Sequence, residues 1–482
     1  MPAHQERIRR IYILLMLGLF PLCGGAYRNI TYGKTLSFLL LSGGLLLALL
    51  LDRLLCRSKE QRSLLPPLLT RPCCFGMKSF LSSDKSRALR FVRLFWLLLA
   101  ASALLSALCS PYLAQTWLGA GRSGGLLMLW LYLLLAGYFS RREELRPLYI
   151  YVLAVSALLL NLLALLQLAG YNPLGLYPAG LTYYDAGSLY PEAFLGTIGN
   201  LNQLGAFYCL AVPLLLGQAW LEKASWRRWP LLAVALLCCG IALVARMEAC
   251  CLGLACGLAL SLPGLSSRPW LRRYGYACLI FLGLAFLAYA LFFPGPVGSS
   301  WWQLHRLLRG MGADHFGSMR LGIWRVAWEA LSQRPLLGWG ADVFRLVYED
   351  LFPPGAVLDA VHNEYLAYWC DAGLLGFCAY LGGLLVSLVC WLRRSLVDRR
   401  CLLPFAMGCC YGVQALFTFS TPLVSPLWWL LWGLGLGLLR EEPDATPDAP
   451  EPAKTAEAAK AVENGSLDQR HPAEHKQGSG SC

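Results

Sequence analysis

Long apolar segments alternate with short polar segments along most of this chain. A helix needs roughly 17–25 predominantly apolar residues to cross a bilayer. Windows of this kind recur often enough to predict about twelve membrane-spanning helices. The predicted spans are residues 11–26, 35–51, 92–112, 124–139, 148–169, 201–220, 230–245, 249–264, 275–293, 364–391, 402–419 and 425–439. We therefore expect an all-α polytopic membrane protein whose bundle occupies residues 1–440.

Residues 320–376 depart from this pattern, because they mix charged side chains and tryptophans with helix-breaking turns. Apolar positions at helical spacing predict an amphipathic helix over 320–333 and a second short helix over 344–351. Pro353-Pro354-Gly355 ends the second helix, and His362-Asn363 then opens a long apolar helix. A lipid-facing bilayer core does not tolerate such broken, charged backbone. This stretch is therefore expected outside the core or lining a wet cavity.

The composition supports the membrane class. Of the residues, 57% are hydrophobic and only 14% are charged, which is too apolar for a soluble protein. The net charge of +13 is explained by loop charges that set topology, so no nucleic-acid partner is expected. Basic residues gather in alternate loops, among them Arg9, Arg141, Arg227, Arg272 and Arg400, whereas the opposite loops carry little beyond Arg28, Lys34 and Arg122.

The excess of basic residues on one side predicts that both termini are cytoplasmic. Two long loops, residues 170–199 and 294–363, are then outward. No cleavable signal peptide is expected, because the first apolar segment lacks a small-residue cleavage site. Residues 441–482, rich in Pro, Ala, Glu and Lys, are predicted to be a disordered cytoplasmic tail. The 19 cysteines fall mostly inside the predicted spans, so neither a disulfide framework nor a metal site is expected.

Arg246 joins two apolar runs with almost no loop between them. At ~1.5 Å per residue, the run over residues 230–245 reaches only about 24 Å, which is less than the hydrocarbon thickness of a bilayer. A charge at such a position is costly, and we expect Arg246 to be recessed and to face a cavity. The alternative is a snorkelling side chain, or one paired with Glu248.

His362 immediately precedes Asn363, which is an apt N-cap for the long apolar helix. The helix dipole disfavours imidazolium there, so His362 is expected to be largely neutral and able to accept a proton. Exposed helix N–H groups nearby would favour phosphate oxygens. The alternatives are a capping or packing role for His362 and a solvated loop charge for Arg320. Asp371, inside the span, is expected to meet a partner inside the bundle, for example a tyrosine or an arginine.

Several short motifs follow one another through the polar stretch. They are Arg320 followed by Trp324, the PLLGWG turn at residues 335–340, and HNEYL at 362–366 with an Asp before GLLG at 373–376. This order resembles the O-antigen ligase and polymerase superfamily.

Two upstream segments extend the resemblance. Gly196-Thr197 and the following GNLNQ at residues 199–203 are similar to the family's GTxGNxN motif, and Arg246 matches the Arg of its SR motif. Ala245 stands where the family has Ser, and Met247 where it has Gly. The resemblance covers roughly residues 150–435.

The resemblance implies a membrane glycosyltransferase with a GT-C-like architecture. Such an enzyme takes a glycan from undecaprenyl diphosphate on the outer face of the bacterial cytoplasmic (inner) membrane and passes it to the hydroxyl of a glycan or glycolipid acceptor. It uses no cofactor, metal or nucleotide sugar. We expect inverting stereochemistry, because no carboxylate nucleophile is evident.

On this hypothesis Arg246 and Arg320 bind the diphosphate, and His362 is the general base or positions the acceptor. Asn202 and Asn363 are candidates for supporting polar contacts. Two alternatives remain: a polymerase of the same superfamily, and a non-enzymatic transporter or flippase. Charges buried within several spans would favour transport, but the charged residues found here cluster on the outward side.

Overall fold

The computed structural model describes residues 3–24, 30–61, 87–177, 183–185, 188–190, 193–297, 299–312, 314, 317, 319–351 and 358–440. The predicted tail at residues 441–482 and the predicted helix break at Pro353-Pro354-Gly355 lie outside these residues.

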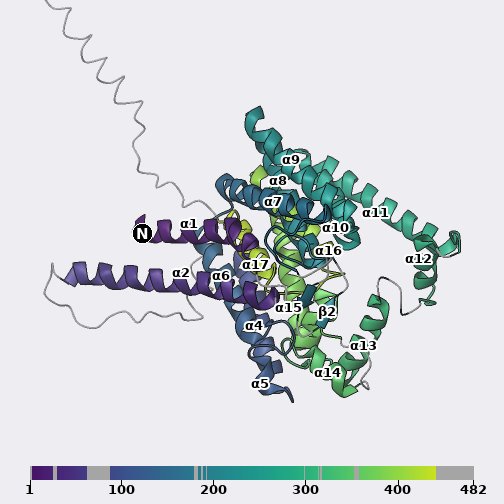
Figure 1. Cartoon of the computed structure of the whole chain (residues 1–482). Helices are drawn as coiled ribbons and strands as arrows, with labels where there is room; N and C mark the ends of the chain where they lie inside the picture. The colour runs from purple at the N-terminus through teal and green to yellow at the C-terminus, as the bar shows by residue number, and fades with distance from the viewer. Residues whose placement is uncertain are drawn as a thin grey trace, which may run out of the picture. The chain divides into compact units, whose positions relative to one another are not determined.

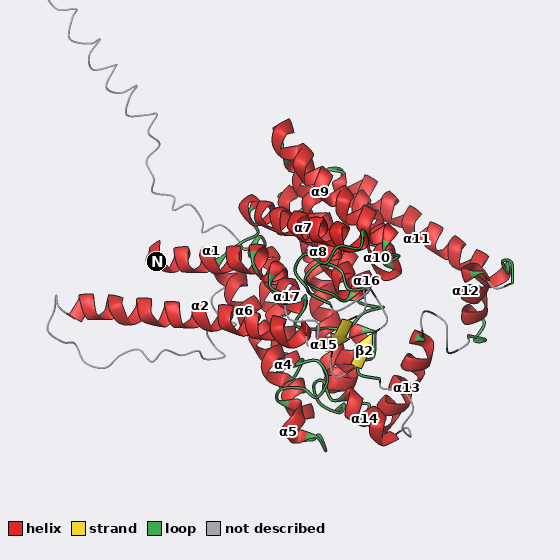
Figure 2. Cartoon of the chain, viewed as in Figure 1, coloured by secondary structure: helices red, strands yellow, loops and turns green. Residues whose placement is uncertain are grey.

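Almost every described element is a helix, apart from one antiparallel hairpin of strands β1 (Tyr183–Asp185) and β2 (Ser188–Tyr190) (Figure 2). In the described part of the chain, eight helices are long and apolar enough to cross a membrane. They are α2 (Ile30–Gln61), α4 (Arg87–Leu108), α7 (Pro147–Leu168), α8 (Leu201–Leu221), α9 (Ser225–Val244), α10 (Glu248–Ser261) continued by η2 (Leu262–Leu265), α11 (Pro269–Phe292) and α15 (Glu364–Arg394). The chain is an all-α polytopic membrane protein.

The expected number of about twelve spans is not confirmed. The other four predicted spans correspond to shorter helices, namely α1 (Ala3–Gly18), α6 (Leu126–Arg142), α16 (Leu402–Gln414) and α17 (Ser425–Gly437). These have 16, 17, 13 and 13 residues. A helix of 13 residues is about 20 Å long, compared with ~30 Å for the hydrocarbon core of a bilayer.

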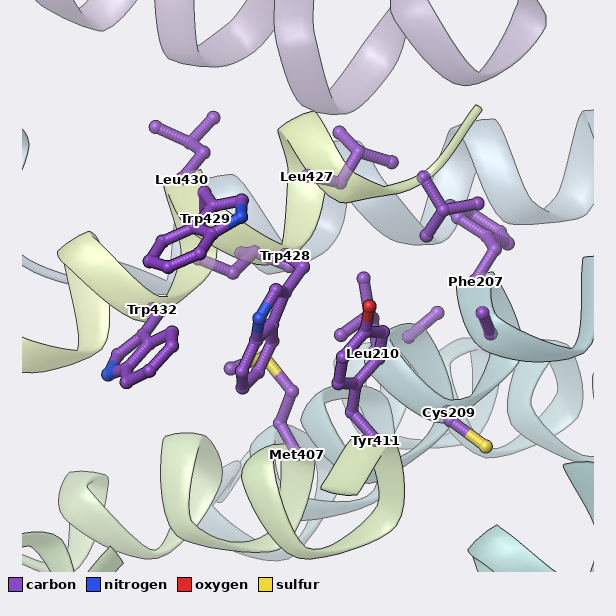
Figure 3. Packing of buried hydrophobic residues seen from close by; sticks show 14 of the residues in the cluster. Phe207, Cys209, Leu210, Met407, Tyr411, Leu427, Trp428, Trp429, Leu430 and Trp432 are labelled. Carbon is purple, nitrogen blue, oxygen red and sulfur yellow. The ribbon is translucent and has the colours of Figure 1, made fainter. Parts of the chain in front are cut away.

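Helix α17 is apolar throughout although it is shorter than a membrane-spanning helix, because it is packed inside the protein. Every residue of α17 is buried, which is the position expected for a helix that is hydrophobic on all sides. Trp428 stacks on Tyr411 of α16 with ring centroids 4.3 Å apart, and Trp429 stacks on Trp432 at 5.0 Å (Figure 3). This aromatic core anchors α16, α17 and the loop between them, which supplies part of the site described below.

Helix α15 is broken at Gly373, where the sequence predicted a single span over residues 364–391. Gly373 has a φ of 71°, and the PLLGWG turn packs into the break. There Trp339 donates its backbone N–H to the carbonyl oxygen of Cys370 over 2.7 Å. A Cβ atom at Gly373 would lie only 2.0 Å from the carbonyl oxygen of Leu336, so glycine is required here. The break therefore docks the turn after α13 against α15.

The segment between α11 and α15 contains three short helices: α12 (Ser300–Leu308), α13 (Arg320–Gln333) and α14 (Phe344–Leu351). The last two coincide with the helices expected from the sequence. Helix α12 was not predicted, although Ser299 marks its start by accepting a hydrogen bond from the N–H of Trp302 over 3.1 Å. Helix α12 packs at the end of α11 (Figure 1), whereas α13 packs against α14 and α15. The first residue of α13 is thereby brought to the start of α15.

Candidate active site

Arg320 begins α13, and its guanidinium group connects separate parts of the chain. It donates hydrogen bonds to Oδ1 of Asn202 over 3.2 Å and to the carbonyl oxygens of Phe417 over 3.2 Å and Gly317 over 2.9 Å. The side chain is half-buried. Arg320 is therefore held in place, unlike the solvated loop charge considered from the sequence. Two of the predicted site residues, Arg320 and Asn202, are in direct contact.

The first turn of α8 holds the residues that follow α16. Asn200 caps α8 by accepting a hydrogen bond from the N–H of Gln203 over 3.1 Å. The Gln203 carboxamide donates to the carbonyl oxygen of Phe419 over 2.9 Å, and that of Gln414 donates to the carbonyl oxygen of Asn202 over 3.1 Å. The GNLNQ motif thus uses its polar side chains to fix the loop between α16 and α17.

His362 lies immediately before the start of α15 and contacts the same loop. Its ring packs edge-on against Phe419 with centroids 4.7 Å apart. Its φ of 53° is uncommon for a residue other than glycine. Asn363 caps α15 by accepting a hydrogen bond from the N–H of Leu366 over 3.1 Å, which confirms the predicted N-cap. His362 and Arg320 therefore both contact residues 417–419.

The surroundings of His362 keep its imidazole neutral. Burial is the largest cause and lowers the pKa of His362 to about 4. Asp359 opposes this shift, whereas the guanidinium groups of Arg320 and Arg122 reinforce it. His362 is thus neutral at pH 7, as its sequence position suggested, with a lone pair that can accept a proton. The main reason is burial, whereas the sequence argument relied on the helix dipole.

Arg122 and Asp359 also belong to this site, and the sequence did not single out either one. Nε and Nη2 of Arg122 lie 2.8 and 2.7 Å from Oδ2 of Asp359. The two side chains are only 4% and 8% exposed. The Arg122 guanidinium also lies over the ring of Phe419, 4.9 Å from its centroid. The available signal was weak: Arg122 is one of the few basic residues in loops predicted to be outward.

The family model described as O-antigen ligase matches residues 193–381. Asn202, Arg246, Arg320 and His362 lie inside the matched segment. The match over residues 193–381 supports assigning this chain to an O-antigen ligase-like superfamily. No curated protein matches the chain. The family consists of glycan-processing membrane enzymes, and the apolar helices agree with a multi-pass member.

In this O-antigen ligase-like protein, Arg246 lies in the turn between α9 and α10, with a φ of 53°. Its side chain is exposed, and within the described residues it has no hydrogen bond or ion pair, including with Glu248. Cys250 of α10 packs against Gly205 of α8, where a Cβ atom would lie 2.8 Å from that of Cys250. Arg246 therefore lies at the same end of the helices as Asn202, without contacting the Arg320 group.

The chain also contains a cavity of about 70 Å³ beside the Arg122–Asp359 pair. Its lining includes Arg122, Tyr368, Asp342, Asp359, Asp371 and Phe419. Oδ1 of Asp371 accepts a hydrogen bond from the N–H of Asp342 over 3.3 Å. Asp371 therefore has a partner inside the protein, as expected, but among the described residues this partner is a main-chain amide instead of a tyrosine or an arginine. Burial raises the pKa of Asp342 to about 6.

Across the described ranges of the chain, no group of three or more His, Cys, Asp or Glu side chains is arranged to hold a metal ion.

Proposed function

We propose that this chain is a glycosyltransferase that moves a glycan from undecaprenyl diphosphate to an acceptor hydroxyl on the outer face of the cytoplasmic membrane. The observation that carries the proposal is that a fixed guanidinium, Arg320, and a neutral imidazole, His362, contact the same loop, residues 417–419. A diphosphate leaving group needs the first of these groups, and a hydroxyl nucleophile needs the second.

The proposed reaction is a single displacement. The bond between the anomeric carbon and the donor phosphate oxygen breaks, and its electron pair leaves with the diphosphate. The acceptor oxygen bonds to the anomeric carbon from the opposite face, and its proton passes to His362. Arg320 and Arg246 stabilise the charge that grows on the diphosphate. Asn202, which orients Arg320, and Asn363 are proposed as supporting polar contacts.

Donor binding would also strengthen the proposed base. A diphosphate next to Arg320 adds negative charge near His362 and offsets the two guanidinium groups that disfavour the imidazolium form. A nearby opposite charge commonly raises a histidine pKa by 1–3 units, an order-of-magnitude estimate. The pKa of His362 would then rise from about 4 toward the pH at which the enzyme works. Proton transfer is most efficient in that range.

Contacts at the far end of α15 support placing the site on the outer face. Helix α15 has 31 residues in two parts separated by the break at Gly373, with His362 before its first turn. Beyond its last turn, Arg400 pairs with Glu144 at 3.3 Å, and Arg440 donates to the carbonyl oxygen of Arg141 over 2.8 Å. Basic residues favour the cytoplasmic side. On this proposal the opposite end of α15, with the site, is external, and the cytoplasmic location of both termini stays a prediction.

The first test is a donor-release assay. Purified full-length protein in lipid nanodiscs, incubated with an undecaprenyl-diphosphate-linked oligosaccharide and a separate acceptor, is expected to release undecaprenyl diphosphate and glycosylate the acceptor. EDTA is expected to leave the rate unchanged, because no step uses a metal. Release with elongation of the lipid-linked chain would instead identify a polymerase. No release at any acceptor concentration would contradict both enzymes and favour transport.

A second test concerns Arg246. We expect Arg246→Ala to lower the release rate by about 10-fold, because an exposed guanidinium is more strongly screened than a buried one. Arg246→Lys should retain most of the rate, since it keeps the charge. Arg227→Ala, an exposed arginine near the other end of α9, is the matched control. Equal rates for the Arg246→Ala and Arg227→Ala variants would remove Arg246 from the donor site.

A further inference from the structure

A loop outside the family-matched segment lies close to His362, the proposed general base. Arg122 lies in the loop between α5 (Leu113–Thr116) and α6, before the matched residues 193–381. Its guanidinium lies 4.9 Å from the centroid of the Phe419 ring, and the ring of His362 lies 4.7 Å from the same centroid. Asp359, shortly before His362 in the chain, forms the ion pair with Arg122. Arg122 is thus linked to His362 through the ring of Phe419, and Asp359 is linked to it through the short backbone segment between residues 359 and 362.

The loop that carries Arg122 is itself clamped. Oδ2 of Asp342 accepts hydrogen bonds from the N–H groups of Arg122 over 2.8 Å and Gly124 over 2.9 Å. The carbonyl oxygen of Asp342 accepts a third from Ala120 over 2.9 Å. These main-chain contacts hold Arg122 at a defined place relative to the PLLGWG turn. The buried ion pair therefore has little freedom to rearrange.

Among the described residues, few charged groups act on His362. Asp359 comes from its own segment, Arg122 from the loop before α6, and Arg320 from the start of α13. Phe419, from the loop before α17, contributes an uncharged ring. The nearby Glu364 carboxylate turns away, because it accepts hydrogen bonds from the hydroxyls of Tyr380 over 2.5 Å and Tyr411 over 2.8 Å. The charge balance at His362 therefore depends on one carboxylate and two guanidinium groups.

We propose that Arg122 and Asp359 are positioning residues for His362, which hold its ring against Phe419 and balance the charge around it so that the imidazole is neutral when it accepts the proton of the acceptor hydroxyl. This inference rests on the glycosyl transfer proposed above. It also assigns the helices before residue 193 a part in the reaction, although the matched family segment does not include them.

Removing one charge of the pair at a time has opposite consequences. Asp359→Asn leaves two guanidinium groups near His362 without their carboxylate, which disfavours imidazolium. The acidic limb of the pH–rate profile should move down by about one pH unit. Arg122→Gln leaves the Asp359 carboxylate without its partner, which favours imidazolium, and the limb should move up by about one unit. Since an active base must be unprotonated, the Arg122→Gln variant loses activity first as the pH falls.

The experiment measures release of undecaprenyl diphosphate against pH for full-length protein in nanodiscs. Arg122→Lys keeps the charge, and the double variant Arg122→Gln with Asp359→Asn removes both charges. Both are expected to keep the limb within about half a unit of the wild type. Deuterium exchange at the imidazole C2–H, read by mass spectrometry on the peptide containing His362, gives the titration midpoint of that residue without turnover.

The outcomes separate the two proposals. Opposite shifts in the single variants, restored in the double variant, would establish the charge balance. Lower plateau rates with an unmoved limb and an unmoved exchange midpoint would show a structural role only and overturn the inference. If Arg122→Gln does not fold, the exchange midpoint of His362 is measured in the double variant and in Arg122→Lys. A midpoint displaced from the wild-type value in either variant would also overturn the inference. A wild-type protein that releases no lipid diphosphate would instead contradict the proposed function, and the exchange titration would still decide the charge balance.

Discussion

We expect Arg320→Ala to lower the rate of undecaprenyl diphosphate release by about 100- to 1,000-fold, the usual effect of removing a preorganised donor to developing charge. The Arg320 guanidinium is already oriented by Asn202, Phe417 and Gly317, so it needs no rearrangement when the leaving group becomes more negative. The measurement is the single-turnover rate with saturating lipid-linked donor, which separates the chemical step from donor binding.

Two variants make the Arg320 test specific. Arg320→Lys keeps the charge but loses the planar fork that meets several acceptors at once, and we expect it to recover only part of the rate. Arg325→Ala is the control, because Arg325 lies on the same helix, is 63% exposed and pairs with Asp314 at 2.7 Å. It should leave release within about 2-fold of the wild type. An Arg320→Ala protein that retains half the wild-type rate would exclude Arg320 from the reaction.

We expect His362→Asn to reduce the turnover rate by about 100- to 10,000-fold, the range associated with loss of a general base. Asparagine is chosen because His362 has a φ of 53°, a conformation that asparagine tolerates better than alanine does. The variant should therefore keep the start of α15 intact while removing the group that accepts the proton. Its KM for the donor should change little, because the guanidinium groups remain.

His305→Ala is the control for the histidine test. His305 is buried in α12, where Nδ1 lies 3.0 Å from the carbonyl oxygen of Ala290, and it has no place in the proposed reaction. We expect its turnover to match the wild type. If His362→Asn raised KM and left turnover unchanged, His362 would bind substrate and another group would have to accept the proton.

The polar stretch after residue 320 shows which parts of the site can be predicted from local sequence. Arg320, His362 and Asn363 stand out because charge, helix caps and turns interrupt an otherwise apolar chain, and the structure has α13 and α15 starting where these residues predict. Asn202 was predicted only as a supporting contact, on the basis of a motif at the start of a span. The structure shows that Asn202 accepts a hydrogen bond from Arg320, and its contact with the substrate stays a prediction.

Arg122 and Asp359 show why the rest of the site escaped prediction. The pair is 237 positions apart in the chain, and neither residue belongs to a pattern that implies the other. Arg246 illustrates the opposite case, because its motif suggested convergence with Arg320, whereas its exposed side chain has no polar partner among the described residues. Its role in binding the donor therefore remains a prediction.

Hydropathy, cap residues and helix breakers are local properties, and they were enough to assign the membrane class, most helices and the polar centre of this chain. The distinction between a spanning helix and a short buried one is not local, since α17 has the composition of a span but only 13 residues packed on all sides by its neighbours. The same holds for the break in α15 and for the Arg122–Asp359 pair. Both depend on contacts between segments far apart in the chain, and such contacts form only when the helices pack together.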